Sequence, residues 1–300
     1  MTNKEILQKL VAAGMRSRYG DHPAKQVLLR YLWEMKHIID AGYVDYYLMA
    51  FWIFRHYADS AGIGFWARGA MPSSFVCYAL MLTDIDPVKY GLHSVRFVND
   101  ELPKFQFDIE ASRFDEFMNK AEELLQAHSK SIDVVSVKSC LFQDLCPSAY
   151  LSRKHERPLP KNLDDELACY ALYFPDTMEL YESYIWRKDG DEIWMETGIE
   201  RLDEILASTY GLLVYQEQML YILKSLFKQF AIPANLIRHA IQWGDKEHVE
   251  KYKAELFTNL QDLTAEEAEK AWEVLISNPK AFLKAHAVSR VLAKYKYEVK

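Results

Sequence analysis

Apolar residues recur at helical spacing early in the chain. Leu28, Leu32, Met35 and Ile39 lie three or four residues apart, which predicts an amphipathic helix. An aromatic run over 43–54 predicts a second helix, and Gly62 is placed to close it. We expect these two helices to pack against each other.

Short segments typical of strands come next. Residues 95–98 and 105–109 either alternate between apolar and polar side chains or are rich in β-branched and aromatic ones. Residues 132–137 are also rich in β-branched side chains. A helix is predicted between the last two segments, at about 112–128. Beyond residue 141 strand signals end, apart from at most one hairpin near 192–195. Helical periodicity then covers the segments 222–230, 236–242, 247–260, 265–276 and 281–297. The pattern predicts an α+β fold with a small mixed sheet and packed helices, followed by an all-helical module.

Composition excludes several classes of protein. Half of the 300 residues are hydrophobic and 26% are charged, which favours a packed core over disorder. The longest uncharged apolar run, 46–54, is much shorter than the ~20 residues of a membrane-spanning helix. The first residues show no secretion signal, so we expect a cytoplasmic protein without membrane partners. The cysteines and histidines lack the spacing of a zinc site.

The net charge of −7 argues against a protein whose whole surface binds nucleic acid. Basic residues nevertheless gather at 280–300, which has six of them and one acidic residue. Two interpretations stay open for this segment: a helix that faces phosphates, or an ordinary solvated helix face.

Three carboxylates could serve catalysis. Asp108 and Glu110 lie two apart in a strand pattern and so share a face, and Asp133 lies on the next predicted strand. Carboxylates on neighbouring strands are typical of two-magnesium centres. The alternative is that Asp108 and Glu110 merely end a strand and cap the helix that begins near Ser112.

Several motifs resemble the alpha subunit of bacterial DNA polymerase III, the C-family replicative polymerase. They occur in the family's order along nearly the whole chain. The most specific are Thr83-Asp84-Ile85-Asp86-Pro87 with Lys89-Tyr90-Gly91-Leu92, then Thr209-Tyr210-Gly211 with Tyr215-Gln216-Glu217-Gln218, and finally Lys284-Ala285-His286-Ala287. The resemblance implies a palm-like module at 1–133, with the thumb reduced to the helix at about 112–128, and a helical fingers-like module at 134–300. It covers the palm and fingers regions, so we expect a truncated and degenerate relative.

The phosphate-binding segments of the family are altered in this sequence. The glycine-rich phosphate loop corresponds to 65–70, where only Arg68 and Gly69 remain and bulky Phe65 and Trp66 replace small residues. The family's basic fingers segment corresponds to 238–245, which keeps Arg238 but has lost lysines. The resemblance implies DNA or phosphate contacts at Arg68, Gly69, Arg187, Lys188, Arg238, Lys284, His286 and Arg290.

The catalytic strand of the family admits two alignments. A gapless match aligns Asp108 with the family's third aspartate, and it aligns Lys104 and Gln106 with the two aspartates that bind metal. Neither lysine nor glutamine can replace a carboxylate as a metal ligand. A shifted register lets Asp108 and Glu110 fill those positions instead. Asp133 matches the later catalytic aspartate in either register.

These observations give three functional hypotheses. The first is a catalytically inactive polymerase III alpha-like protein that binds nucleic acid, weakly at most, or a replication or repair partner, with no cofactor or metal. The second is a Mg²⁺-dependent nucleotidyltransferase that uses Asp108, Glu110 and Asp133, with Asp108 and Asp133 as metal ligands. The third is a scaffold that contacts proteins only.

Overall fold

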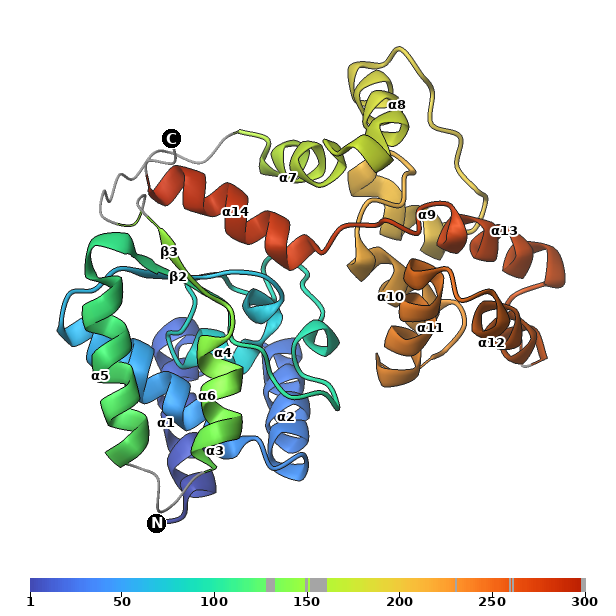
Figure 1. Cartoon of the computed structure of the whole chain (residues 1–300). Helices are drawn as coiled ribbons and strands as arrows, with labels where there is room; N and C mark the ends of the chain where they lie inside the picture. The colour runs from blue at the N-terminus through green and yellow to red at the C-terminus, as the bar shows by residue number, and fades with distance from the viewer. Residues whose placement is uncertain are drawn as a thin grey trace. The chain divides into compact units, whose positions relative to one another are not determined.

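The structure, a computed structural model, describes residues 1–127, 133–148, 151, 161–229, 231–258, 260 and 262–297 (Figure 1). The chain divides into two compact units. The first comprises Met1–Leu159 together with Val288–Lys300, and the second comprises Pro160–Ala287. Residue 133, at which the sequence placed the boundary between two modules, lies inside the first unit.

Helices make up most of the first unit. They are α1 (Asn3–Tyr19), α2 (Lys25–Asp40), α3 (Val44–Ala50), α4 (Phe75–Ala79), α5 (Phe114–Ala127), α6 (Val134–Phe142) and the π-helix η1 (Phe51–Ala58). Thr2 and Glu5 form a capping box at the start of α1, which satisfies two backbone N–H groups. The prediction of Gly62 as the closing residue is confirmed, since the chain reverses there at φ +67° and Ile63 N donates to Ala58 O at 2.8 Å.

The buried stripe of α2 differs from the predicted one. Met35 is buried as expected, but Leu28 and Leu32 are 39% and 60% exposed. Val27 and the carboxylate of Glu34 face the core in their place. Glu34 is buried because it accepts hydrogen bonds from the first backbone N–H groups of α4, at Phe75 and Val76, and these bonds compensate its lost hydration.

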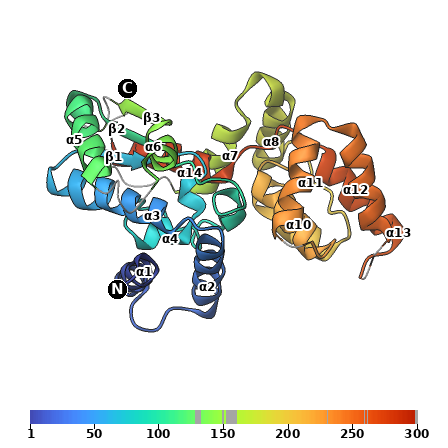
Figure 2. The same ribbon diagram turned by 60° about the horizontal axis from the view of Figure 1, so that its bottom comes forward.

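A small mixed sheet lies in the first unit (Figure 2). It contains β1 (Phe65–Ala67), β2 (Phe107–Glu110) and β3 (Leu145–Ser148), in that order. β1 is antiparallel to β2, with Trp66 opposite Asp108, and β2 is parallel to β3, with Asp108 opposite Cys146. The predicted α+β class and the mixed sheet are confirmed.

Two of the predicted strands are wrong. Residues 94–96 form a 3-10 turn instead of a strand. Asp133 is the N-cap of α6, so 134–137 is helical; Ile132 lies outside the described residues. The cap bonds from Val135 N and Ser136 N to the Asp133 carboxylate outweigh the weak strand preference of a β-branched run. β1 and β3 supply the other strands, the latter in a segment predicted to be helical.

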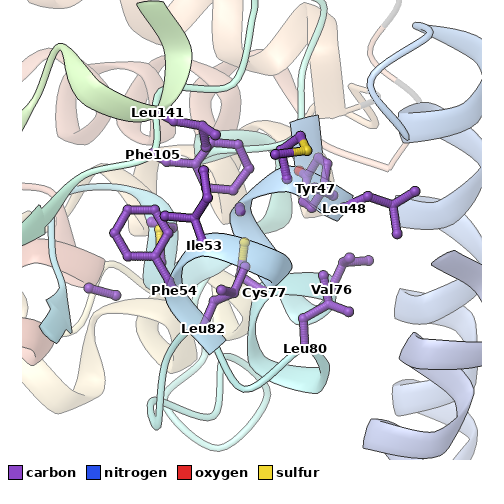
Figure 3. Close-up of a cluster of buried hydrophobic side chains, with 14 of the residues drawn as sticks. Tyr47, Leu48, Ile53, Phe54, Val76, Cys77, Leu80, Leu82, Phe105 and Leu141 are labelled. Atoms are coloured by element: carbon purple, nitrogen blue, oxygen red, sulfur yellow. The ribbon is translucent and has the colours of Figure 1, made fainter. Parts of the chain in front are cut away.

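Aliphatic and aromatic side chains together form the core of the first unit (Figure 3). Phe54 of η1 stacks on Phe107 of β2, with ring centroids 3.8 Å apart. Tyr47 meets Phe105 edge to face at 5.3 Å, a geometry that aromatic pairs favour. This core fixes β2 against the helices and thereby sets the position of Asp108, the next residue after Phe107.

The regular secondary structure of the second unit is helical in the described residues, apart from a single β-bridge between Tyr215 and Phe282. Its helices are α7 (Leu163–Leu172), α8 (Met178–Asp189), α9 (Glu200–Leu206), α10 (Gln216–Ser225), α11 (Ala231–Trp243), α12 (Lys246–Thr258) and α13 (Ala265–Ile276). Residues 192–195 form no hairpin. The last helix, α14 (Lys284–Lys296), has residues in both units. In the described part of the chain, no helix has the length and apolar character needed to cross a membrane.

Candidate functional site

Asp108 of β2 is buried and lies between two arginines. Its side chain is 2% exposed, with Arg68 Nε 3.1 Å from Oδ1 and Arg290 Nη1 3.1 Å from Oδ2. A buried carboxylate is stable only when its charge is compensated. Here the compensating charges are supplied by the protein's own guanidinium groups, one on each oxygen.

Arg68 joins all three strands. It follows β1, pairs with Asp108 of β2, and its Nη2 donates to Asp144 O at 2.7 Å and to Cys146 Sγ at 3.0 Å. Only 15% of its side chain is exposed. Arg68, which the resemblance suggested as a phosphate ligand, is therefore committed to internal contacts in this arrangement.

Gln106 occupies the space behind the loop that follows β1. Arg68 N donates to Gln106 O at 2.9 Å. Gly69 has φ +63°, and a Cβ built on it would lie 1.5 Å from Gln106 Oε1. Lys104 is exposed. Gln106 thus packs under the loop, where its amide offers no carboxylate to a cation.

The other two catalytic candidates serve local structure. Glu110 accepts hydrogen bonds from Gly64 N at 3.2 Å and Ser112 Oγ at 2.7 Å. Asp133 caps α6, and its hydrogen bonds with the Ser136 side chain and backbone lower the pKa of the Asp133 carboxyl below its usual value. Each carboxylate is used by the backbone or a hydroxyl group beside it.

These residues do not fit a two-magnesium centre as they stand. Mg²⁺ requires near-octahedral oxygen coordination, to which one or two protein carboxylates contribute directly. Both Asp108 oxygens face arginines, and in the described ranges no three His, Cys, Asp or Glu side chains are grouped so that they could hold a metal ion. The structure does not gather Asp108, Glu110 and Asp133 into one metal-binding group.

The basic candidates of the second unit also make internal contacts. Arg187 donates to Glu192 Oε1 at 2.7 Å and to Tyr210 O at 3.1 Å, and Lys188 pairs with Asp189 at 2.5 Å. Arg238 is 1% exposed and donates to Asn235 Oδ1 and Gln242 Oε1. A buried arginine that bonds to neighbouring side chains is unsuited to reach a phosphate outside.

The motif residues of α14 are divided between the units. Lys284 and His286 belong to the second unit and Arg290 to the first. Lys284 Nζ lies over the ring of Tyr215, 5.4 Å from its centroid, and the His286 ring lies 5.7 Å from that of Phe282. Both side chains therefore contact aromatic rings of their own unit.

Sequence reasoning missed how closely α14 joins β1. Trp66 Nε1 donates to Ser289 Oγ at 3.0 Å, and that hydroxyl donates to Ala67 O at 2.7 Å. Nearby, Asp84 pairs with Arg18 at 3.3 Å and with Lys296, beside a cavity of about 280 Å³. The bulk of Trp66 in a loop expected to be glycine-rich was the signal for this packing.

Several residues that carry the family motifs hold the fold. Asp86 accepts hydrogen bonds from Tyr19 OH and Val88 N at 2.6 and 2.8 Å. Buried Glu217 accepts from Lys284 N at 2.8 Å, and Gln218 Oε1 accepts from Tyr215 N at 2.8 Å. These motif residues therefore make hydrogen bonds within the fold, mostly with backbone N–H groups.

Comparison with known proteins matches two consecutive segments. Residues 5–139 match the family described as the bacterial DNA polymerase III alpha NTPase domain, and residues 148–264 match the bacterial DNA polymerase III alpha subunit finger domain. Both descriptions refer to parts of the same polymerase subunit.

Individual relatives agree with these matches. The chain is 35% identical over 121 residues to an error-prone DNA polymerase of Anaeromyxobacter sp. (strain K), covering 39% of this chain and 11% of that protein. It is 26% identical over 223 residues to DNA polymerase III subunit alpha of Campylobacter jejuni, covering 70% of this chain and 18% of that protein. The chain thus aligns with less than a fifth of the length of these relatives. It belongs to the family of bacterial DNA polymerase III alpha subunits, with matched segments in the NTPase domain and the finger domain.

Proposed function

We propose that the chain is a non-catalytic member of its family that acts in DNA replication or repair by binding a partner. The observation that carries this proposal is the double ion pair of Asp108 with Arg68 and Arg290. Asp108 is the one carboxylate that both alignments place on the family's catalytic strand. The two ion pairs give it a structural role.

The chemistry of nucleotide addition supports this view. Two divalent ions must activate the attacking oxygen and neutralise the charge that develops on the transferred phosphoryl group. Glu110 and Asp133 are engaged in local hydrogen bonds, and Gln106 lies under the loop that would cradle a triphosphate. Metal binding and nucleotide binding are therefore weakened by separate features.

The charge distribution favours a protein partner over DNA. Phosphate binding needs cations at the surface, whereas Arg68, Arg187 and Arg238 are turned to internal acceptors. The net charge of −7 adds a general repulsion of nucleic acid. Weak, salt-sensitive DNA binding is the most that this arrangement supports.

A primer-extension assay with the whole chain tests the proposal. No incorporation is expected with Mg²⁺ or with the more permissive Mn²⁺, beside the Bacillus subtilis DNA polymerase III subunit alpha as a positive control. Incorporation that disappears in both Asp108→Ala and Asp133→Ala would overturn the proposal and establish these aspartates as metal ligands.

A further inference from the structure

An open pocket lies on the hairpin formed by α11 and α12, which lie next to each other in Figures 1 and 2. The pocket has a volume of about 290 Å³ and is lined by His239, Trp243, Asp245, His248 and Tyr252 together with Leu236. All of these residues belong to the second unit, and none of them is used by the proposed function so far.

Planar rings make up most of the pocket wall. The His239 and Trp243 rings lie 6.0 Å apart, and the His248 and Tyr252 rings lie 6.1 Å apart. Trp243 is 76% exposed and Leu236 is 54% exposed. The wall therefore presents aromatic faces to a molecule outside.

The turn between the helices adds hydrogen-bond acceptors. Gly244 adopts φ +67°, and Asp245 then caps α12 through a bond from His248 N at 3.2 Å. Its second oxygen lies 2.8 Å from His248 Nδ1. When Nδ1–H donates to Asp245, the neutral ring keeps Nε2 as an acceptor. The pocket thus holds a carboxylate and an oriented imidazole beside the aromatic faces.

The charge of the wall selects the ligand. Of the described residues that line the pocket, Asp245 carries the one carboxylate, and none is a lysine or an arginine. The nearest arginine in sequence, Arg238, is buried and bonds to Asn235 and Gln242, which lie on another stripe of α11.

We propose that this pocket receives the side chain of an arginine or lysine from a protein partner. A cation over the faces of Trp243 and Tyr252 gains cation–π attraction, while Asp245 and His248 accept its N–H groups. A nucleic acid would place phosphates beside a carboxylate without any lining cation to balance them. The inference rests on the proposed partner-binding function and specifies the chemistry of that partner.

A peptide titration of the whole chain, followed by NMR, tests the inference. The probe is a five-residue peptide with a central arginine between glycines and blocked ends, compared with the same peptide carrying glutamine or glutamate at the centre. The arginine peptide should bind about two- to fivefold more tightly than the glutamine peptide, with shifts confined to the α11–α12 hairpin. The glutamate peptide should bind most weakly.

Two variants and one control locate the binding. Trp243→Ala should abolish the preference for arginine, whereas Trp186→Ala, which removes a half-exposed tryptophan of α8, should leave it unchanged. Asp245→Asn keeps a good N-cap and removes the charge, so it should lower the affinity for the arginine peptide while the melting temperature is preserved.

Three results would overturn the inference: equal affinity for the arginine and glutamine peptides, an unaltered preference in Trp243→Ala, or tighter binding of a single-stranded oligothymidine at the same residues. Primer extension is measured independently of these titrations. A chain that ignores the arginine peptide and does not extend primers refutes this inference alone, whereas a chain that extends primers refutes the proposed function.

Discussion

Arg290 and Asp108 are 182 residues apart in the sequence, and Nη1 of the arginine lies 3.1 Å from Oδ2 of the aspartate. Ser289, the residue before Arg290, bonds to Trp66 and Ala67 of β1. The middle of α14 is thus tied to two neighbouring strands by adjacent side chains. A carboxylate that holds a helix onto a sheet is expected to behave differently on substitution from one that is reserved for a metal.

Replacing Asp108 with alanine should lower the free energy of unfolding by about 3 kcal/mol or more. The substitution leaves two guanidinium groups, of which Arg68 is mostly buried, without their shared anion. Chemical denaturation followed by circular dichroism measures the change, with the half-exposed Glu110→Ala as a control on the same strand. Unchanged or increased stability would contradict a structural role, because carboxylates held together for metal binding commonly destabilise a fold.

Gly69→Ala should destabilise the protein by about 1–2 kcal/mol through its left-handed backbone alone, with an added cost from the clash with Gln106 Oε1. A double-mutant cycle with Gln106→Ala separates these contributions, since removing the amide relieves the clash and leaves the backbone cost. Additive effects of the two substitutions would show that Gln106 does not pack under the loop.

Asp84 should make stability depend on pH. Burial on its own raises the pKa of Asp84, but the hydrogen bond and charge of Lys296 and the charge of Arg18 outweigh it, and the pKa lies below its usual value. A lowered folded-state pKa stabilises the protein fully above the unfolded value of about 3.9. This stabilisation is lost as the pH falls through the folded value. Thermal melts should show Asp84→Asn less stable than the parent at pH 7, and the difference should shrink on acidification.

Lys296→Met provides the reciprocal test for this pair. It removes the main cation beside Asp84 and should reduce the same acid-dependent loss of stability. A parent and an Asp84→Asn variant that respond identically to pH would mean that the Asp84 pKa is not lowered by folding.

DNA binding should be weak and sensitive to salt. With so many basic candidates engaged internally, few phosphate contacts remain, so the plot of log affinity against log salt should have a shallow slope. Fluorescence anisotropy with primed and single-stranded DNA measures it at several salt concentrations. Tight binding that persists at high salt would show that contacts other than phosphate pairing hold the DNA.

Helices were predicted well because their signals are local. Periodic apolar residues identified the segments that become α12, α13 and α14, with ends shifted by a few residues. The strands were harder, because β1 and β3 are short and their partners lie far away in the sequence. The segment after Asp133 was also predicted wrongly. It is rich in β-branched residues, but it forms a helix that Asp133 caps.

For the candidate site, residue types were easier to predict than contacts. The sequence singled out Asp108, Arg68 and Arg290, but nothing in their spacing indicated that the arginines would meet the aspartate. Their proximity depends on the three-dimensional placement of α14. Leu28 and Leu32 illustrate a related failure, because periodicity alone does not tell which of two adjacent stripes of a helix faces the core.

The order of synthesis has a consequence for how this protein folds. The second unit is continuous in sequence, whereas the first unit needs residues 288–297, which leave the ribosome after all of the second unit. Synthesis proceeds at about 5–20 residues per second, so Ser289 and Arg290 are made many seconds after Trp66 and Asp108. During that interval the Asp108 carboxylate lacks Arg290 and the Trp66 indole lacks Ser289.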